Sequence, residues 1–263
     1  MPDDRKPSRT SPTPSTPAAA NSAPSDQALD ARGEPLPANA SEGEVADFIA
    51  RMKTLAPAQT QGRGRLIFAM DATMSREPTW DLALGLQAEM FRAVKNIGGL
   101  DVQLVYFRGA GECRASKWVA DPDALARLMT TVRCMGGHTQ IGKVLVHAVR
   151  EAEDKKVAAM VYVGDAMEER IDDLCARAGQ VGLLGVPVFL FQEGGDPAVA
   201  RTYKEIARLT KGAYCRFDAG SAQQLRDLLS AVAVYAAGGR KALQRLSDQT
   251  GSAGARLLLG QMK

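Results

Sequence analysis

The stretch LIFAMDATMS at residues 66–75 decides the fold of this chain. Its first five residues are all apolar and are preceded by a glycine-rich segment, which is typical of a buried β-strand. Asp71 stands at the carboxyl end of this strand, and Thr73 and Ser75 follow at alternate positions. One carboxylate and two hydroxyls on a short loop are hard oxygen donors, which suit Mg2+ better than Zn2+ or Cu2+.

Strand-like and helix-like segments alternate from residue 65 onward. The expected strands are 66–70, 100–107, 157–163, 186–191 and 213–217, with a returning antiparallel edge strand at 113–119. The expected helices are 79–96, 122–132, 141–153, 170–180, 197–210 and 222–236. This alternation predicts an α/β fold, in which helices cover both faces of a largely parallel sheet.

Composition divides the chain into four parts. Residues 1–40 are rich in Pro, Ser and Ala, and we expect a disordered tail there because such a segment buries too little apolar surface to fold. Residues 41–63 open with a capping-box pattern and predict a short helix followed by a linker. The main domain is expected at 64–237. Residues 238–263 form a basic, partly helical extension, which we interpret as a solvated surface segment.

Several classes of function are disfavoured by composition. The formal net charge is only +3 and the aromatic residues are few and scattered, so we expect no nucleic-acid partner. No stretch approaches the roughly 18 apolar residues of a membrane span, and the first residues do not resemble a secretory signal. The four cysteines lie far apart and form no C-x-x-C pair. These features together predict a cytoplasmic protein without membrane contact.

Two further loops follow the predicted strands and carry oxygen donors. Thr139 ends the glycine-led loop that precedes the helix at 141–153, and Asp165 comes directly after the strand at 157–163. Ligands of open parallel sheets bind at the carboxyl ends of the strands, where these loops would meet Asp71. The five candidate ligands are Asp71, Thr73, Ser75, Thr139 and Asp165. Two carboxylates and three hydroxyls suit an octahedral Mg2+ with open positions, with Mn2+ or Ca2+ as alternatives.

This arrangement resembles the metal-ion-dependent adhesion site of von Willebrand factor type A (VWA) domains. The family motif is usually Asp-x-Ser-x-Ser, and Thr73 here keeps the hydroxyl of the middle position. The resemblance covers about residues 64–237. It implies a Rossmann-like sheet of about six strands with one antiparallel edge strand. It also implies a protein-binding module that is not an enzyme, in which an Asp or Glu of a protein partner completes the metal shell.

A Mg2+-dependent phosphatase of the haloacid dehalogenase type is the main alternative. Such an enzyme would use Asp71 as the nucleophile, Thr139 and Lys143 on the phosphoryl group, and acidic residues such as Glu169 on the metal. However, its acid/base residue is expected two positions after the nucleophile, where Thr73 has no suitable pKa. A VWA-like scaffold that binds no metal is the third possibility, in which Asp71 only caps a helix.

Other charged residues near these loops have simpler interpretations. Glu168 and Glu169 are expected to be first-turn charges of the helix that follows them, favoured by its macrodipole. Arg108, Arg114 and Lys117 flank the predicted hairpin. We expect them to be solvated charges that protect a sheet edge.

Overall fold

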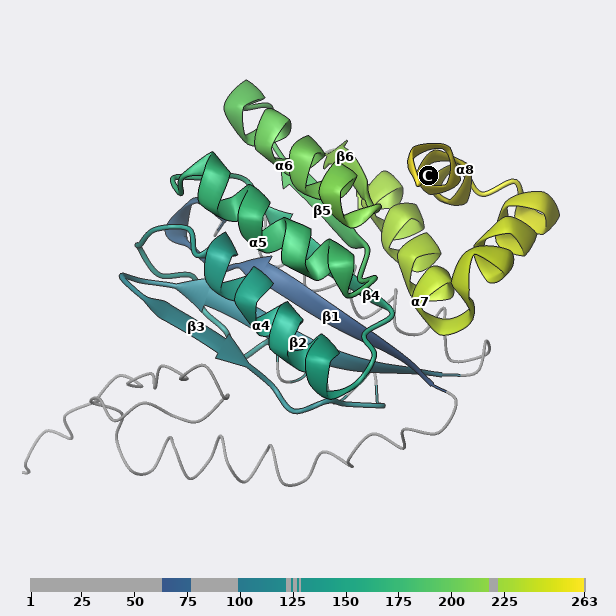
Figure 1. Ribbon diagram of the computed structural model, residues 1–263, viewed down its shortest axis with the longest axis horizontal. Helices are drawn as coiled ribbons and strands as arrows, with labels where there is room; N and C mark the ends of the chain where they lie inside the picture. The colour runs from purple at the N-terminus through teal and green to yellow at the C-terminus, as the bar shows by residue number, and fades with distance from the viewer. Residues whose placement is uncertain are drawn as a thin grey trace, which may run out of the picture.

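The structure is a computed structural model that describes residues 63–76, 99–121, 124, 127, 129–217 and 222–262 (Figure 1). The expected tail at 1–40, the short helix at 41–62 and the helix at 79–96 lie outside the described residues. Five of the eleven positions of the helix expected at 122–132 also lie outside them.

One six-stranded sheet forms the centre of the described part (Figure 1). Its strands are β1 (Gly64–Asp71), β2 (Leu100–Arg108), β3 (Glu112–Ala115), β4 (Ala159–Gly164), β5 (Val188–Glu193) and β6 (Ala213–Phe217). Their order across the sheet is β3-β2-β1-β4-β5-β6, and only β3 runs antiparallel to its neighbour. The predicted α/β fold with one antiparallel edge strand is confirmed.

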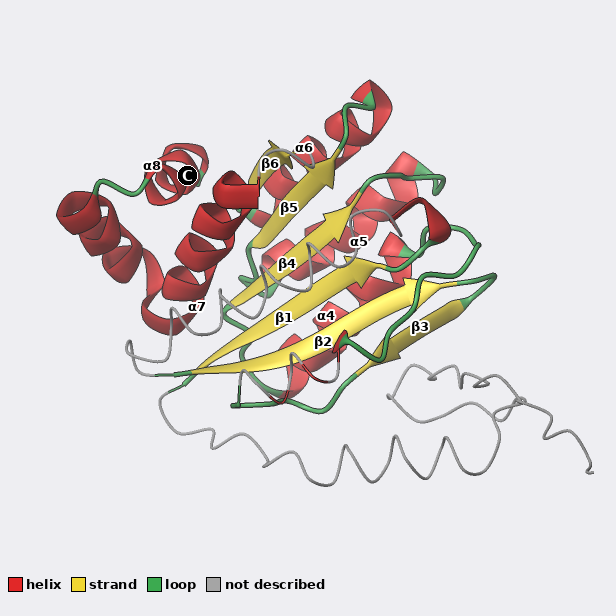
Figure 2. Ribbon diagram, turned by 180° about the vertical axis from the view of Figure 1, so that it is seen from behind, coloured by secondary structure: helices red, strands yellow, loops and turns green. Residues whose placement is uncertain are grey.

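Helices flank this sheet on both faces. The described helices are the short 3-10 helix η1 (Met74–Arg76), α4 (Ile141–Asp154), α5 (Ile171–Leu183), α6 (Pro197–Thr210), α7 (Ala222–Thr250) and α8 (Ala253–Gln261). The face toward the viewer in Figure 1 carries α4, α5 and α6, and Figure 2 shows the same sheet from behind with α7 and α8 at its side. β1 lies between β2 and β4, so the loop after β1 lies between the loops that follow these two strands.

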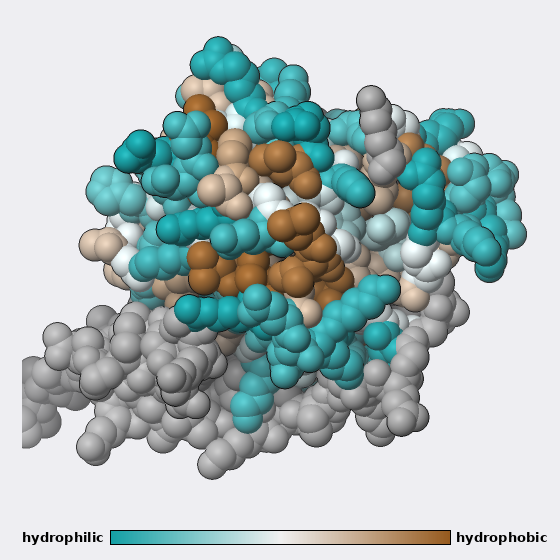
Figure 3. All heavy atoms as spheres, in the orientation of Figure 1, coloured by the Kyte–Doolittle hydropathy of each residue, from teal (hydrophilic) through white to brown (hydrophobic). Residues whose placement is uncertain are grey.

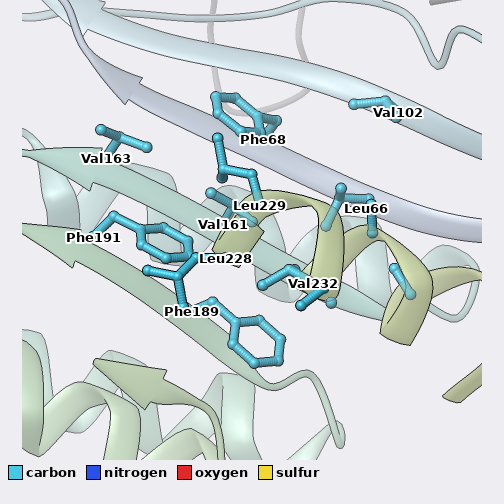
Figure 4. Packing of buried hydrophobic residues seen from close by; sticks show 14 of the residues in the cluster. Leu66, Phe68, Val102, Val161, Val163, Phe189, Phe191, Leu228, Leu229 and Val232 are labelled. Atoms are coloured by element: carbon cyan, nitrogen blue, oxygen red, sulfur yellow. The ribbon is translucent and has the colours of Figure 1, made fainter. Parts of the chain in front are cut away.

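Both faces of β1 are buried, which explains its continuous apolar sequence. Leu66 and Phe68 point into one core, and Ile67 and Ala69 point into the other core against α4. Parallel strands covered on both sides show such runs instead of polar and apolar alternation. Figure 4 shows the first core, where side chains of α7, including Val232, pack against the sheet. The fully buried strand fixes the position at which the chain leaves the sheet.

The carboxyl-terminal segment belongs to this first core. α7 bends at Gly239, whose φ of 69° is a left-handed value that favours glycine, and α8 folds back against α7. Leu243, Ala255 and Leu258 are fully buried in the same cluster as the β1 residues. The helical character expected at 238–263 is confirmed, whereas its interpretation as a solvated surface segment is wrong at these positions. The expected domain boundary at 237 falls within α7.

We expect Leu258→Ala to lower the free energy of unfolding by about 3 kcal/mol, because it leaves a cavity in a closed core. Leu258 is 0% exposed, whereas its neighbour Leu257 is 40% exposed and serves as the matched control. Urea denaturation of both variants measures the difference. Equal, small effects for Leu257→Ala and Leu258→Ala would show that α8 adds nothing to the core.

The outer surface over α4, α5 and α6 carries an apolar area surrounded by hydrophilic residues (Figure 3). Leu183 and Leu184, at the carboxyl end of α5, are 89% and 41% exposed.

Within the described residues, none of the helices combines the length and the apolar character needed to span a bilayer.

Candidate metal centre

The loop after β1 brings the first three predicted ligands together. The carboxylate of Asp71 is 0% exposed, and its Oδ1 accepts a 2.8 Å hydrogen bond from the backbone N–H of Thr73. The hydroxyl oxygens of Thr73 and Ser75 lie 3.1 Å apart. Ser75 is exposed, so this short polar cluster runs from the buried end of β1 to the surface.

The glycine-led loop before α4 lies against the carboxyl ends of β1 and β2. The N–H of Met135 donates to the carbonyl of Ala72 at 3.0 Å, and the N–H of His138 donates to the carbonyl of Gly109 at 3.2 Å. A Cβ at Gly137 would lie 2.1 Å from the Gly109 carbonyl oxygen, so the close approach requires glycine. The sequence prediction that this loop reaches the end of β1 is therefore consistent with the structure.

Thr139 is joined to the loop that follows β4. Its hydroxyl accepts a 3.0 Å hydrogen bond from the N–H of Glu168, and its own N–H donates to Glu168 Oε2 at 2.7 Å. Glu168 lies three residues after Asp165, the predicted ligand of that loop. The two loops therefore hold each other in register through a reciprocal pair of hydrogen bonds.

Glu169 caps α4, a helix to which it does not belong. Its carboxylate accepts hydrogen bonds from the N–H groups of Ile141 at 2.6 Å and Gly142 at 2.7 Å. Gln140, the N-cap residue of α4, makes no side-chain cap hydrogen bond, so Glu169 satisfies donors that would otherwise lack a partner. The interpretation of Glu168 and Glu169 as charges serving their own following helix is wrong. Glu169 binds the first turn of α4, and Glu168 binds Thr139 in the loop just before that helix.

The two predicted carboxylate ligands act on each other electrostatically. Burial is the main cause that raises the pKa of Asp71 to about 6, and the negative charge of Asp165 acts in the same direction. Hydrogen bonds from Thr73 and the positive charge of Arg76 lower that pKa. Asp71 is therefore charged at neutral pH at a cost to the folded state. A cation bound beside it would offset this cost.

Several buried oxygen atoms of this region lack a hydrogen-bond partner among the described residues. They include Asp71 Oδ2 and Asp165 Oδ1. Buried carboxylate oxygens without partners are rare, because removing them from water is costly. A divalent cation would satisfy two such carboxylates, so the donor set fits Mg2+. The described residues contain no cluster of three or more His, Cys, Asp or Glu arranged for a metal.

A buried ion pair beneath these residues was not anticipated from the sequence. Arg76, the last residue of η1, is 0% exposed, and its guanidinium forms an ion pair with Glu193 at the end of β5. β4 lies between β1 and β5 in the sheet, so the Arg76 side chain passes the end of β4. No local pattern signals this pair, because its members are separated by more than a hundred positions in the sequence.

The residues required by the phosphatase alternative are engaged elsewhere. The Lys143 ammonium group is exposed and donates a 2.6 Å hydrogen bond to the carbonyl of Gly111 in the β2–β3 turn. Thr73 occupies the acid/base position, where its hydroxyl lies beside that of Ser75. None of these contacts supports phosphoryl transfer.

The charges of the β2–β3 hairpin differ from the expectation. Arg108 and Arg114 are only 6% and 8% exposed, and both pair with Glu112. Their interpretation as solvated edge charges is wrong, because both side chains are buried and share the carboxylate of Glu112. Lys117 is exposed, as expected.

Exposed apolar side chains extend from three segments at this end of the sheet. Met74 in η1 is 50% exposed, Met135 in the glycine-led loop is 39% exposed, and Ile171 at the start of α5 is 43% exposed. Each adjoins a segment that carries a candidate ligand. The polar centre therefore has apolar neighbours at the surface.

Comparison with known proteins gives matches at the level of structure. No protein-family model and no curated protein matches the sequence. A von Willebrand factor type A structure from Catenulispora acidiphila matches with a TM-score of 0.55 and 15% identity, over 67% of this chain and 43% of that chain. The SpRpn10 VWA domain matches with a TM-score of 0.52 and 10% identity, over 63% of this chain and 94% of that domain.

The pilus adhesin SpaC from Lactobacillus rhamnosus GG, in its open conformation, is a third match. Its TM-score is 0.54 and its identity 12%, over 69% of this chain and 31% of the adhesin. This chain thus spans less than half the length of the Catenulispora acidiphila and SpaC chains. At these identities the likeness concerns the fold. The fold of this chain is that of the von Willebrand factor type A domains.

Proposed function

We propose that this chain is a metal-dependent protein interaction module. Its ligands are Asp71, Thr73, Ser75, Thr139 and Asp165, with Mg2+ as the expected metal and Mn2+ or Ca2+ as alternatives. The observation that carries the proposal is a pair of buried carboxylate oxygens after neighbouring strands, Asp71 Oδ2 and Asp165 Oδ1, which have no hydrogen-bond partner among the described residues. The VWA fold supports a role in protein binding. A cytoplasmic location stays a prediction.

The charges of the site favour an acidic group on the partner. Asp71 and Asp165 carry two negative charges, which one divalent cation balances, so no excess negative charge repels an incoming carboxylate. When bound, Mg2+ would supply coordination positions for an outside carboxylate oxygen. The buried strands and the Thr139–Glu168 hydrogen bonds hold the protein ligands in place, which limits the ordering required on binding.

The apolar side chains beside the centre would supply contacts that a single carboxylate lacks. Met74, Met135 and Ile171 are exposed around the loops that carry the ligands. Interfaces gain much of their affinity from buried apolar anchors, and methionine adapts to partners of different shape. The proposed partner segment therefore presents an Asp or Glu next to apolar residues.

The test is affinity capture with the full chain in Mg2+ and in EDTA, followed by identification of the bound proteins. We expect Thr139→Ala to abolish capture of the Mg2+-dependent partner, because the variant removes a ligand hydroxyl. Thr139→Ser keeps that hydroxyl and is expected to retain capture. Thr250→Ala, at an exposed position near the end of α7, serves as the matched control.

Thermal denaturation of each variant checks that the fold is kept. A partner that binds equally well in EDTA and to Thr139→Ala would overturn the proposed function, because its binding would need neither the metal nor this loop.

A further inference from the structure

Arg76 places a positive charge inside the candidate metal centre. It directly follows Ser75, and its N–H donates a 3.0 Å hydrogen bond to the Thr73 carbonyl, which closes the turn that carries both hydroxyl ligands. Its side chain is 0% exposed and its guanidinium pairs with Glu193. A guanidinium stays protonated in proteins, so this position carries a permanent charge.

The path of the Arg76 side chain brings that charge to both carboxylate ligands. It starts after β1 and reaches the last residue of β5, while β4 lies between these strands and is followed by Asp165. Asp165 and Asp71 both stabilise the charged form of Arg76, and they oppose burial, which is the main cause that lowers its pKa. The guanidinium therefore lies within electrostatic range of both predicted acidic ligands.

The charges of this group leave room for one divalent cation. Asp71, Asp165 and Glu193 are acidic and Arg76 is basic, so two negative charges remain uncompensated among these four residues. A bound divalent cation would restore neutrality. Its charge would nevertheless be repelled by the guanidinium, and such repulsion is strong where water is excluded.

We propose that Arg76 is a built-in cation of the metal centre, which holds the affinity for divalent metal below the value that Asp71 and Asp165 alone would give. Glu193 limits this effect by neutralising part of the guanidinium charge. The inference rests on the proposed function, since it concerns the same metal centre. It also assigns a consequence to partner binding, because a carboxylate from outside brings a negative charge that attracts both the bound metal and Arg76. Metal and acidic partner would therefore strengthen each other's binding.

Charge-removing variants of the two paired residues test this role with the metal alone. Calorimetric titration of the full chain with MnCl2 gives the affinity of the wild type, Arg76→Met, Glu193→Gln and the double variant. We expect Arg76→Met to raise the affinity about tenfold or more and Glu193→Gln to lower it about tenfold or more. The double variant removes both charges and is expected to return to within about threefold of the wild type.

A purely structural role of the ion pair predicts a different pattern. If Arg76 only fastened η1 to β5, both single variants would loosen the loop and weaken metal binding, and the double variant would not recover. That result, or an unchanged affinity in Arg76→Met, would overturn the inference. Arg76→Lys retains the charge and is expected to bind metal like the wild type. Together with Glu193→Gln it tests the proposal even where Arg76→Met fails to fold.

The outcomes also separate this inference from the proposed function. Metal binding by Arg76→Met without any by the wild type would support the built-in cation and overturn metal-dependent capture by the natural chain. Binding by the wild type with no change in the folded variants would overturn the built-in cation only. Absence of binding in all folded variants would overturn both.

Discussion

Asp71→Asn is expected to abolish the binding of divalent cations to this chain. The variant keeps the shape of the side chain and the oxygen that accepts the Thr73 hydrogen bond, but it removes one of the two acidic ligands. The loss of a buried charge next to a divalent ion lowers the affinity by about a hundredfold or more. Calorimetric titration with MnCl2 measures the loss. Asp172→Asn, at an exposed position in the first turn of α5, is the matched control.

The same substitution separates metal binding from folding. Burial raises the pKa of Asp71 to about 6, so the folded state carries an unfavourable charge at neutral pH when no metal is bound. Because Asn is neutral, we expect the Tm of Asp71→Asn in EDTA to be no lower than that of the wild type. Addition of metal should raise the Tm of the wild type and leave that of the variant unchanged. Retained metal affinity in Asp71→Asn would remove Asp71 from the ligand set.

Glu151→Ala is expected to lower the free energy of unfolding by about 3 kcal/mol, because it leaves a buried guanidinium without its ion-pair partner. Glu151 Oε2 accepts hydrogen bonds from Arg65 Nη2 and from Trp118 Nε1, both at 2.7 Å. Its Oε1 accepts a further 3.0 Å bond from Gln103 Nε2. Arg65 is only 5% exposed and lies 3.9 Å over the Trp118 ring, so the loss disturbs a packed group.

Urea denaturation measures this effect, with Glu153→Ala as the control. Glu153 lies on the same helix and is exposed. Its replacement by Ala therefore has the same effect on helix propensity as Glu151→Ala but removes no buried contact. A similarly small loss in both variants would show that water replaces Glu151 around Arg65. Glu151 lies near the carboxyl end of α4, so metal affinity should be unchanged in both variants.

The sequence by itself determined the class of the fold, a mostly parallel sheet with one antiparallel edge strand. The apolar run of β1 predicted a buried strand, and the alternation of segments implied parallel neighbours joined by helices. The turn at 109–111 predicted the antiparallel edge strand β3, which the structure confirms. Asp71, Thr73 and Ser75 are close in the chain, so the short-range geometry of their loop also followed from their spacing. Their role as metal ligands stays a prediction.

Only the tertiary structure decided the partners of the charged residues. Glu169 caps α4, Glu112 pairs with Arg108, and Arg76 pairs with Glu193. Local sequence patterns predicted none of these three contacts. The sequence shows that a residue is charged, but its burial depends on which strands become neighbours. The same reason applies to residues of α8 such as Leu258, which are buried because α7 bends and returns α8 to the core. Local propensity specifies elements, whereas long-range packing selects the atoms that each buried charge and apolar group must meet.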